Sequence, residues 1–91
     1  MSFTVKYEER AVKQIRKLDN SAKRLIKSWI EKNLVGTSDP RRFGKALKGD
    51  LGEYWRYRVG DYRIIAEIVD QEVLIIVVEV GHRKDIYQRQ K

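Results

Sequence analysis

Three arginines in one short segment carry the clearest chemical signal in this 91-residue sequence. Arg56, Arg58 and Arg63 flank a Gly-Asp pair at positions 60–61. This pair between two apolar-rich runs favours a two-residue hairpin loop, because Gly accepts the positive φ that such loops require. In that register Arg58 pairs directly with Arg63, and paired residues project from the same side of a sheet. All three arginines are therefore expected on one face of the hairpin.

The same register predicts a core for the other face of the hairpin. That face collects Trp55, Tyr57, Val59, Tyr62, Ile64 and Ala66. On the arginine face, like charges directly opposed destabilise a sheet, so the Arg58–Arg63 pair favours a site for an anion. The guanidinium fork fits phosphate in particular. The alternative is a solvated face whose arginines are balanced by nearby carboxylates, for which Glu53, Asp61 and Glu67 are available.

The residues after the last expected strand would complete a phosphate-handling site. That strand, Val73–Val80, returns beside the 60–61 turn, so His82 and Arg83 should emerge near the hairpin arginines, with Tyr87 a few residues on. Cleavage of RNA through its 2′-hydroxyl needs a base, cations for the phosphorane and an acid for the leaving 5′-oxygen. Arg cannot be the base. His82 could be acid or base, or purely structural, and Tyr87 could stack on a nucleobase or exchange a proton.

The overall charge agrees with a nucleic-acid or acidic protein partner. Twenty Lys and Arg oppose 13 Asp and Glu, a net charge of +7. Further candidates for RNA binding are Arg41, Arg42, Lys45, Lys48 and Lys84. The chain has no cysteine and one histidine, and no metal-ligand spacing is evident, which disfavours a metal nuclease. No apolar run reaches the ~18 residues of a membrane span and no signal peptide is evident, so we expect a cytoplasmic protein.

Hydrophobic periodicity predicts one α+β domain over residues 1–91. A strand is expected at Phe3–Tyr7, and a helix begins near Glu8 and runs to Leu18. A second helix follows the capping residues 19–21 and ends before Gly36; its apolar stripe is Ala22, Leu25, Ile26, Trp29, Ile30 and Leu34. A loop and three strands complete the order, at Tyr54–Val59, Tyr62–Val69 and Val73–Val80. The two helices should form an antiparallel hairpin on one face of a mainly antiparallel sheet.

Three segments together resemble the RelE-type toxins of bacterial toxin–antitoxin systems, in the RelE/ParE superfamily. They are Ala46–Leu51, Tyr54–Ile65 and Val80–Tyr87, and the expected order of helices and strands also matches that family. The resemblance implies a RelE-like fold and an mRNA interferase, an endoribonuclease that enters the ribosomal A site and cuts mRNA, inhibiting translation. It implies metal-free attack by the RNA's own 2′-hydroxyl, with no cofactor.

The resemblance also implies roles for single residues. Arg56 and Arg58 fall where RelE has catalytic lysines, and Arg63 and Arg83 match its phosphate- and transition-state-binding arginines. Arg in place of Lys removes a lysine general base, which shifts proton transfer to other groups or leaves positioning and electrostatics to drive the reaction.

Two further positions match the family, and the absence of a lysine base shifts proton transfer toward them. Tyr87 matches a C-terminal tyrosine that stacks on the substrate, although its spacing from Arg83 is shorter here. His82 matches a basic position just before the catalytic arginine.

The resemblance implies two partners and leaves two alternatives. The partners are the ribosome with mRNA in its A site and a cognate antitoxin that lays an acidic or amphipathic segment over the basic face. One alternative is a ParE-type inhibitor of DNA gyrase, which shares the fold. The other is a non-catalytic basic module that binds RNA through arginines and rim aromatics.

Overall fold

The computed structural model describes residues 1–47 and 54–82. In this part of the chain the elements are β1 (Thr4–Tyr7), α1 (Glu9–Arg16), α2 (Asn20–Asn33), β2 (Lys45–Ala46), β3 (Tyr54–Val59), β4 (Tyr62–Val69), the 3-10 turn η2 (Asp70–Glu72) and β5 (Leu74–His82). The bounds of β3 and β4 are those expected from the sequence. Within the described residues, the longest helix has 14 residues, and no helix is long and apolar enough to cross a bilayer.

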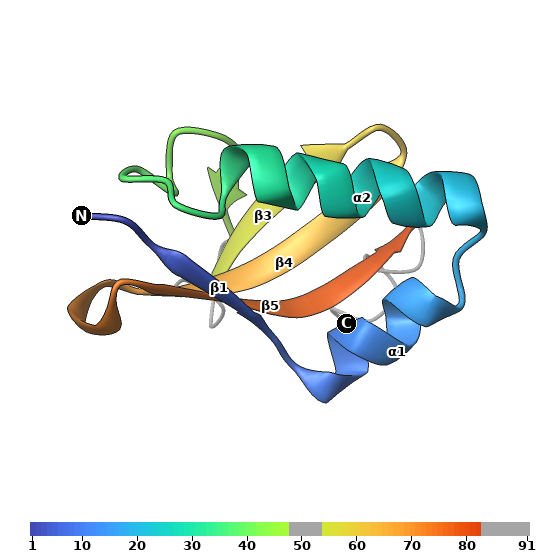
Figure 1. Cartoon of the computed structure of the whole chain (residues 1–91), viewed down its shortest axis with the longest axis horizontal. Helices are drawn as coiled ribbons and strands as arrows, with labels where there is room; N and C mark the ends of the chain where they lie inside the picture. Colours follow the sequence, from blue (N-terminus) through green and yellow to red (C-terminus); the bar gives the residue numbers. More distant parts are fainter. Residues whose placement is uncertain (48–53, 83–91) are drawn as a thin grey trace.

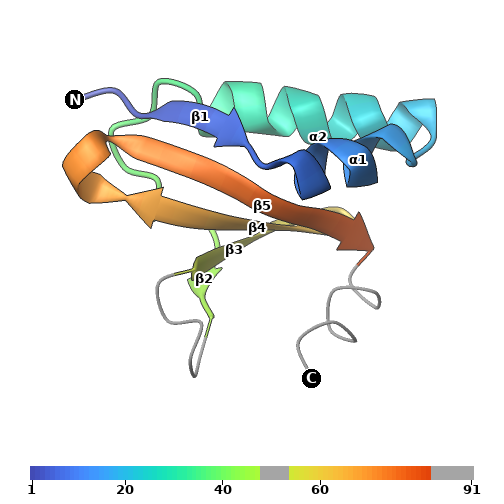
Figure 2. The same cartoon turned by 90° about the horizontal axis from the view of Figure 1, so that it is seen from below.

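The strands form one sheet with the order β1-β5-β4-β3-β2 (Figure 1). Neighbouring strands are antiparallel except β1 and β5, which run parallel. Both helices lie on the same side of the sheet and run in roughly opposite directions (Figure 2). The expected class is therefore confirmed: an α+β fold in which a helix pair covers one face of a mainly antiparallel sheet.

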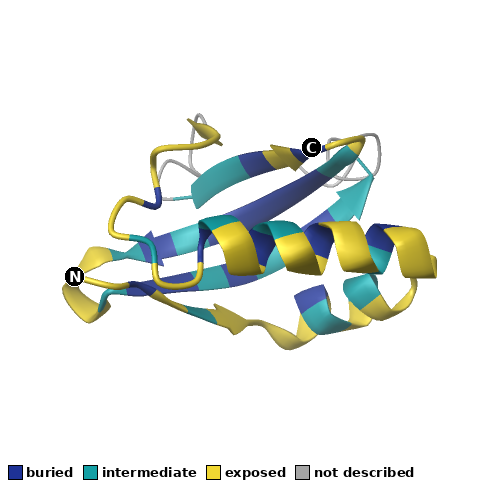
Figure 3. Ribbon diagram, turned by 45° about the horizontal axis from the view of Figure 1, so that its top comes forward, coloured by how far each residue is buried: buried dark blue, intermediate teal, exposed yellow. Residues whose placement is uncertain are grey.

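A side-chain cap and a narrow apolar stripe explain helix α2. The Asp19 carboxylate accepts a hydrogen bond from the Ala22 amide at 2.8 Å, which begins α2 as an N-cap. Along α2 the buried positions lie on the side that faces the sheet, and the outer side is exposed (Figure 3). The expectation that Leu25 belongs to the buried stripe is wrong, because this residue is 47% exposed. The stripe is therefore narrower than the sequence pattern indicates.

Four element assignments differ from the sequence expectations. Strand β5, expected at Val73–Val80, begins at Leu74 and continues to His82. Phe3 lies before β1 and exchanges hydrogen bonds with the 36–37 loop, 2.9 Å in each direction. Helix α1 ends at Arg16, short of Leu18. The segment expected as a loop contains β2, which pairs with β3 through Lys45↔Arg56. A two-residue strand is too short to show alternation, so no sequence pattern could indicate it.

The two faces of the sheet carry separate apolar clusters. The main core lies between the sheet and the helices and includes Ala11, Ile26, Ile30, Tyr57, Ile64, Val77 and Val80. A smaller cluster gathers Leu47, Ile65, Tyr54 and Val78. Because Ile65 alternates with Ile64 along β4, this second cluster lies on the face turned away from the helices. We call that side of the sheet the open face.

Candidate active site on the open face of the sheet

The β3–β4 hairpin has the register that the sequence predicts. Gly60 adopts φ +60° in the two-residue turn, and Arg58 pairs directly with Arg63. Since their neighbours Tyr57 and Ile64 are fully buried under the helices, both arginines leave the sheet on the open face. Arg56 follows by alternation. The sequence prediction of three arginines on one face is thus confirmed.

The cations of the open face differ in their exposure to solvent. Arg58 is exposed, Arg56 is half-buried, and Arg63 is only 6% exposed. Lys45 lies opposite Arg56 in the β2–β3 pairing and is exposed. An anion approaching from solvent would therefore meet Arg58 and Lys45 first, with the Arg63 guanidinium held beneath the surface in a fixed position.

A carboxylate that the sequence did not single out also lies in this row. The β4–β5 register places Glu79 beside Ile65, next to a β-bulge. Burial raises the pKa of Glu79, and the Arg10 guanidinium, 3.8 Å from its Oε1 atom, opposes that shift. Glu67, one of the carboxylates expected to balance the arginines, pairs with Tyr54 at the other end of the open face.

His82 belongs to a different side of the sheet from the arginines. It pairs with Tyr62, and the two rings pack edge to face with centroids 5.9 Å apart. Tyr62 packs against the main core, whereas Arg63, the next residue, points to the open face. The residue that pairs with Arg63 is Gly81, so the end of β5 does return beside the hairpin turn as expected. The structure brings Arg56, Arg58, Arg63 and Lys45 together, but directs the His82 ring away from them.

Arg41 and Arg42 lie in the loop between α2 and β2. Arg41 forms a two-pronged hydrogen bond with Asp70, at 3.0 and 2.9 Å, and its guanidinium lies 5.9 Å from the Trp55 ring centroid. The hydrogen bond lowers the pKa of Asp70. Arg42 lies over the ring of Phe43 at 5.5 Å. Asp70 follows the end of β4, so Arg41 lies at the opposite end of the β3–β4 pair from Arg58 and Arg63.

Four of the expected site residues lie outside the described residues: Lys48, Arg83, Lys84 and Tyr87. The carboxylate of Glu53 does too. Across residues 1–47 and 54–82, no group of three or more His, Asp or Glu side chains is arranged to hold a metal ion.

Tyr54 is a site candidate that the sequence reasoning missed. It precedes Arg56 and Arg58 at two-residue spacing, so all three side chains project from the open face. Its ring is half-buried and packs against the cluster of Leu47 and Ile65, which fixes its orientation. The alternation of Tyr54, Arg56 and Arg58 is visible in the sequence and was the signal that could have found it. An aromatic ring in line with cations is a suitable platform for a nucleobase.

Comparison with known proteins identifies the family of this chain. Residues 5–87 match the sequence model of the family described as the ParE toxin of the type II toxin–antitoxin system parDE. The chain is 31% identical to Toxin RelG of Mycobacterium tuberculosis over 90 residues, which are 98% of this chain and 100% of that protein. It is 29% identical to the mRNA interferase toxin RelE of Escherichia coli over 86 residues, 92% of this chain and 86% of that protein.

Solved structures show the same fold. The toxin–antitoxin complex RelBE2 of Mycobacterium tuberculosis matches with a TM-score of 0.82 and 25% identity, covering 91% of this chain and 100% of that chain. The isolated Escherichia coli RelE toxin matches with a TM-score of 0.73 over 98% of this chain and 95% of that chain, at 24% identity. The chain therefore belongs to the ParE toxin family of type II toxin–antitoxin systems, and within the RelE/ParE superfamily it is a RelE-type toxin.

Proposed function

We propose that this toxin is a ribosome-dependent endoribonuclease that cuts mRNA in the A site and thereby stops translation. Its relatives named mRNA interferase support this activity. The observation that carries the proposal is the direct pairing of Arg58 with Arg63 on the open face, beside Arg56 and Lys45. Two guanidinium groups directly opposed on one face can bind a single phosphate together, because arginine matches the geometry and charge of that anion. The site would act in the cytoplasm, where translating ribosomes are.

The proposed reaction is attack by the RNA's own 2′-hydroxyl, without metal or cofactor. The 2′-oxygen loses its proton, bonds to phosphorus and displaces the 5′-oxygen, which takes up a proton. The products are a 2′,3′-cyclic phosphate and a 5′-hydroxyl end. Arg58 would bind the phosphate from the solvent side, and Arg63 and Arg83 would stabilise the negative charge of the phosphorane. Flanking phosphates would be held by Arg42, Lys45, Lys48 and Lys84. Arg41 could join them, but its charge is shared with Asp70.

The arginines of the open face do not explain how protons are transferred in this reaction. Arg56 and Arg58 cannot act as bases, since a guanidinium stays protonated. The ring of His82 lies on the side of Tyr62, so it would reach a phosphate at Arg63 only around the end of β5. We therefore assign proton transfer to Tyr87 ahead of His82, with most of the rate supplied by positioning and charge.

The test is cleavage of a defined mRNA on programmed ribosomes by the purified toxin. The expected cut is in the A-site codon and leaves a cyclic phosphate, and a single 2′-deoxy nucleotide on the 5′ side of the scissile bond should abolish it. Undiminished cleavage of the deoxy substrate would rule out 2′-hydroxyl attack. In cells, a folded toxin carrying both Arg63→Ala and Arg83→Ala should have lost its toxicity at equal expression; wild-type toxicity would contradict the assigned arginines.

A partner and a second candidate function follow from the same comparisons. The RelBE2 neighbour was solved as a complex of toxin and antitoxin, which supports a cognate antitoxin for this chain. The family description names ParE, which favours inhibition of DNA gyrase as the second candidate. A supercoiling assay with purified gyrase separates the two: inhibition together with intact ribosome-bound mRNA would replace the ribonuclease proposal. Binding of RNA without either effect would indicate a non-catalytic module.

A further inference from the structure

Strand β5 loses its outer neighbour before it ends. The parallel pairing of β1 with β5 runs only as far as Tyr7↔Val77, and the chain then leaves the sheet to form α1. Strand β5 itself continues to His82. Among the described residues, no strand therefore lies along the outer edge of β5 beyond Val77. Backbone groups on that edge need other partners, because a buried polar group without one is costly.

Helix α1 provides such a partner from a side chain. The Gln14 Oε1 atom accepts a hydrogen bond from the Val80 backbone N–H at 2.7 Å, and Val80 is only 1% exposed. One helical turn earlier, the Arg10 guanidinium lies 3.8 Å from the carboxylate of Glu79. Residues at i and i+4 share one face of a helix. Arg10 and Gln14 thus contact two successive residues of β5 from the same side of α1, and we call this pair the α1 clamp.

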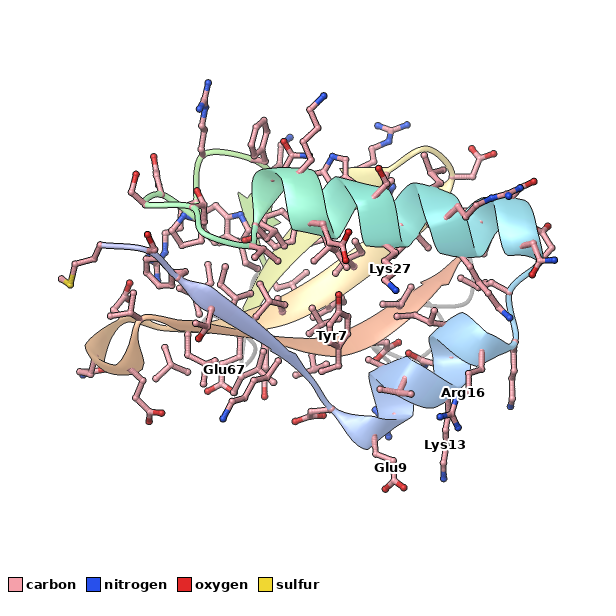
Figure 4. The ribbon with its side chains drawn as sticks, in the orientation of Figure 1. Tyr7, Glu9, Lys13, Arg16, Lys27 and Glu67 are labelled. Atoms are coloured by element: carbon pink, nitrogen blue, oxygen red, sulfur yellow. The ribbon has the colours of Figure 1, made fainter. Side chains whose placement is uncertain are left out.

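The side chains on the outward side of α1 make no such contact with the sheet. Figure 4 shows Glu9 and Lys13 directed away from the sheet, and they form an exposed ion pair with each other at 3.9 Å. Gln14, in contrast, is half-buried, and its amide oxygen takes the place of a missing strand at Val80.

The α1 clamp lies next to an irregularity in the sheet. The bulge in the β4–β5 pairing leaves Val78 without a partner on β4. A bulge disrupts the ladder locally and bends the strand that contains it. Beyond the bulge the ladder resumes, and Gly81 pairs with Arg63. The two clamped residues are those between Val78 and Gly81, so the clamp fixes the backbone of β5 just before it passes beside Arg63.

We propose that Gln14 is a positioning residue for RNA cleavage and acts through the end of β5. This inference rests on the proposed function, in which Arg63 and Arg83 stabilise the phosphorane. Gly81 lies directly opposite Arg63, and Arg83 follows Gly81 by two positions in the chain. The rate of such a reaction depends steeply on placement, since a displacement of about 1 Å can cost ~100-fold. Arg10 contributes less, because its own side chain is 52% exposed.

The test compares variants in steady-state cleavage on programmed ribosomes across a range of ribosome concentrations. Gln14→Met keeps an unbranched side chain with good helix propensity but removes the acceptor. Gln14→Glu keeps an oxygen acceptor one helical turn from Arg10. Lys13→Met is the matched control on the outward side of α1. Gly36→Ala is the control for a general loss of stability, because Gly36 has a positive φ and donates its N–H to the Phe3 carbonyl, beside the start of β1.

In Gln14→Met, kcat should fall at least about tenfold while KM stays within about threefold of wild type. The reason for this split is that Arg58 and Lys45, which an incoming anion meets first, lie on β3 and β2, away from the clamp. Gln14→Glu should keep kcat within about threefold of wild type, because its carboxylate still accepts from Val80. Both controls should keep the wild-type kcat, Gly36→Ala despite a lower melting temperature. A wild-type kcat in Gln14→Met, or an equal loss in Gly36→Ala, would overturn the positioning role.

Hydrogen exchange of the Val80 amide, followed by NMR, tests the contact independently of cleavage. Exchange should be at least about tenfold faster in Gln14→Met than in the wild type, and Gln14→Glu should restore the protection. Unchanged exchange in Gln14→Met would overturn the clamp and leave the proposed function standing. A wild-type toxin that does not cleave mRNA on ribosomes would overturn the proposed function and the role of Gln14 in it, while the exchange of Val80 would still decide whether the clamp exists.

Discussion

Arg58 and Arg63 face each other across the β3–β4 hairpin, and this pairing links stability to function at the scale of single residues. Two guanidinium groups directly opposed on a sheet repel, and a bound phosphate would offer both of them one shared anion. If an arginine binds substrate at the expense of stability, its replacement should lower activity without lowering the free energy of unfolding.

We predict that Arg58→Thr separates these two effects. Thr suits a strand and removes the charge, so the free energy of unfolding should stay equal or rise by up to ~1 kcal/mol. Cleavage on programmed ribosomes should fall at least about tenfold. Thermal unfolding and single-turnover kinetics measure the two changes. Lys6→Thr, on the far edge strand β1, is the matched control and should alter neither; a clear loss of stability in Arg58→Thr would contradict the repulsion.

Tyr54 tests the idea that the open face also holds a nucleobase. If its ring stacks on RNA, Tyr54→Phe should keep nearly full cleavage, and Tyr54→Ala should raise KM with a smaller change in kcat. The measurement is steady-state cleavage on programmed ribosomes across a range of ribosome concentrations. Equal activity of Tyr54→Ala and wild type would remove Tyr54 from the site, and a large loss in Tyr54→Phe would indicate a role for the hydroxyl instead.

The Arg41–Asp70 pair predicts a pH effect at one carboxyl group. The hydrogen bond to Arg41 holds the pKa of Asp70 below its ordinary value, so the pair contributes stability at neutral pH. That contribution is lost as the pH falls through the lowered pKa. In Arg41→Ala the pKa of Asp70 should return to its usual range, which NMR titration of the Asp70 carboxyl carbon would detect. An unchanged pKa would show that Arg41 does not hold Asp70 in solution.

At the scale of elements, the loop between α2 and β2 is fixed to the edge of the sheet by side chains from β3. The Tyr57 hydroxyl donates to the Pro40 carbonyl at 2.6 Å, and the Trp55 indole donates to the Phe43 carbonyl. Gly44 then turns the chain, with φ +80°, so close to β3 that a Cβ there would meet the Arg56 carbonyl oxygen. These contacts place Lys45 opposite Arg56 and so complete the cationic row of the open face.

Gly44→Ala should therefore destabilise the protein by about 3 kcal/mol, since strain at positive φ adds to a steric overlap with β3. Gly36→Ala is the matched control: Gly36 also has a positive φ, +79°, but a Cβ there has no neighbour within 4 Å. It should cost only about 1 kcal/mol. Chemical denaturation of the two variants measures the difference. Equal losses would show that the close approach to β3 is not rigid.

The elements also show why some features were predictable and others were not. Alternation and a Gly-Asp turn determine the β3–β4 register locally, so the arginine face followed from the sequence. The β4–β5 pairing contains a β-bulge between Ile65 and Ala66, which shifts the register by one residue and has no marker in the sequence. For this reason the sequence could not predict on which face His82 lies, or that Glu79 approaches the open face. Leu25 fits the helical period but lies at the border of the buried stripe, beside the β3–β4 turn, and stays 47% exposed.

At the scale of the whole molecule, the positive charge divides between the two sides of one sheet. The open face carries the arginines proposed to bind RNA, and the helix-bearing side carries Arg16, Lys23, Arg24 and Lys27 around a separate groove. The net charge of +7 is therefore divided between two surfaces that the sheet separates.

Cleavage of mRNA in the ribosomal A site by this toxin can be measured in cells by mapping mRNA 5′ ends after brief induction. We expect new 5′-hydroxyl ends within codons that occupy the A site, and we expect them to be absent when Arg58→Thr is induced to the same level. Intact mRNA accompanied by DNA damage and inhibited gyrase would contradict it.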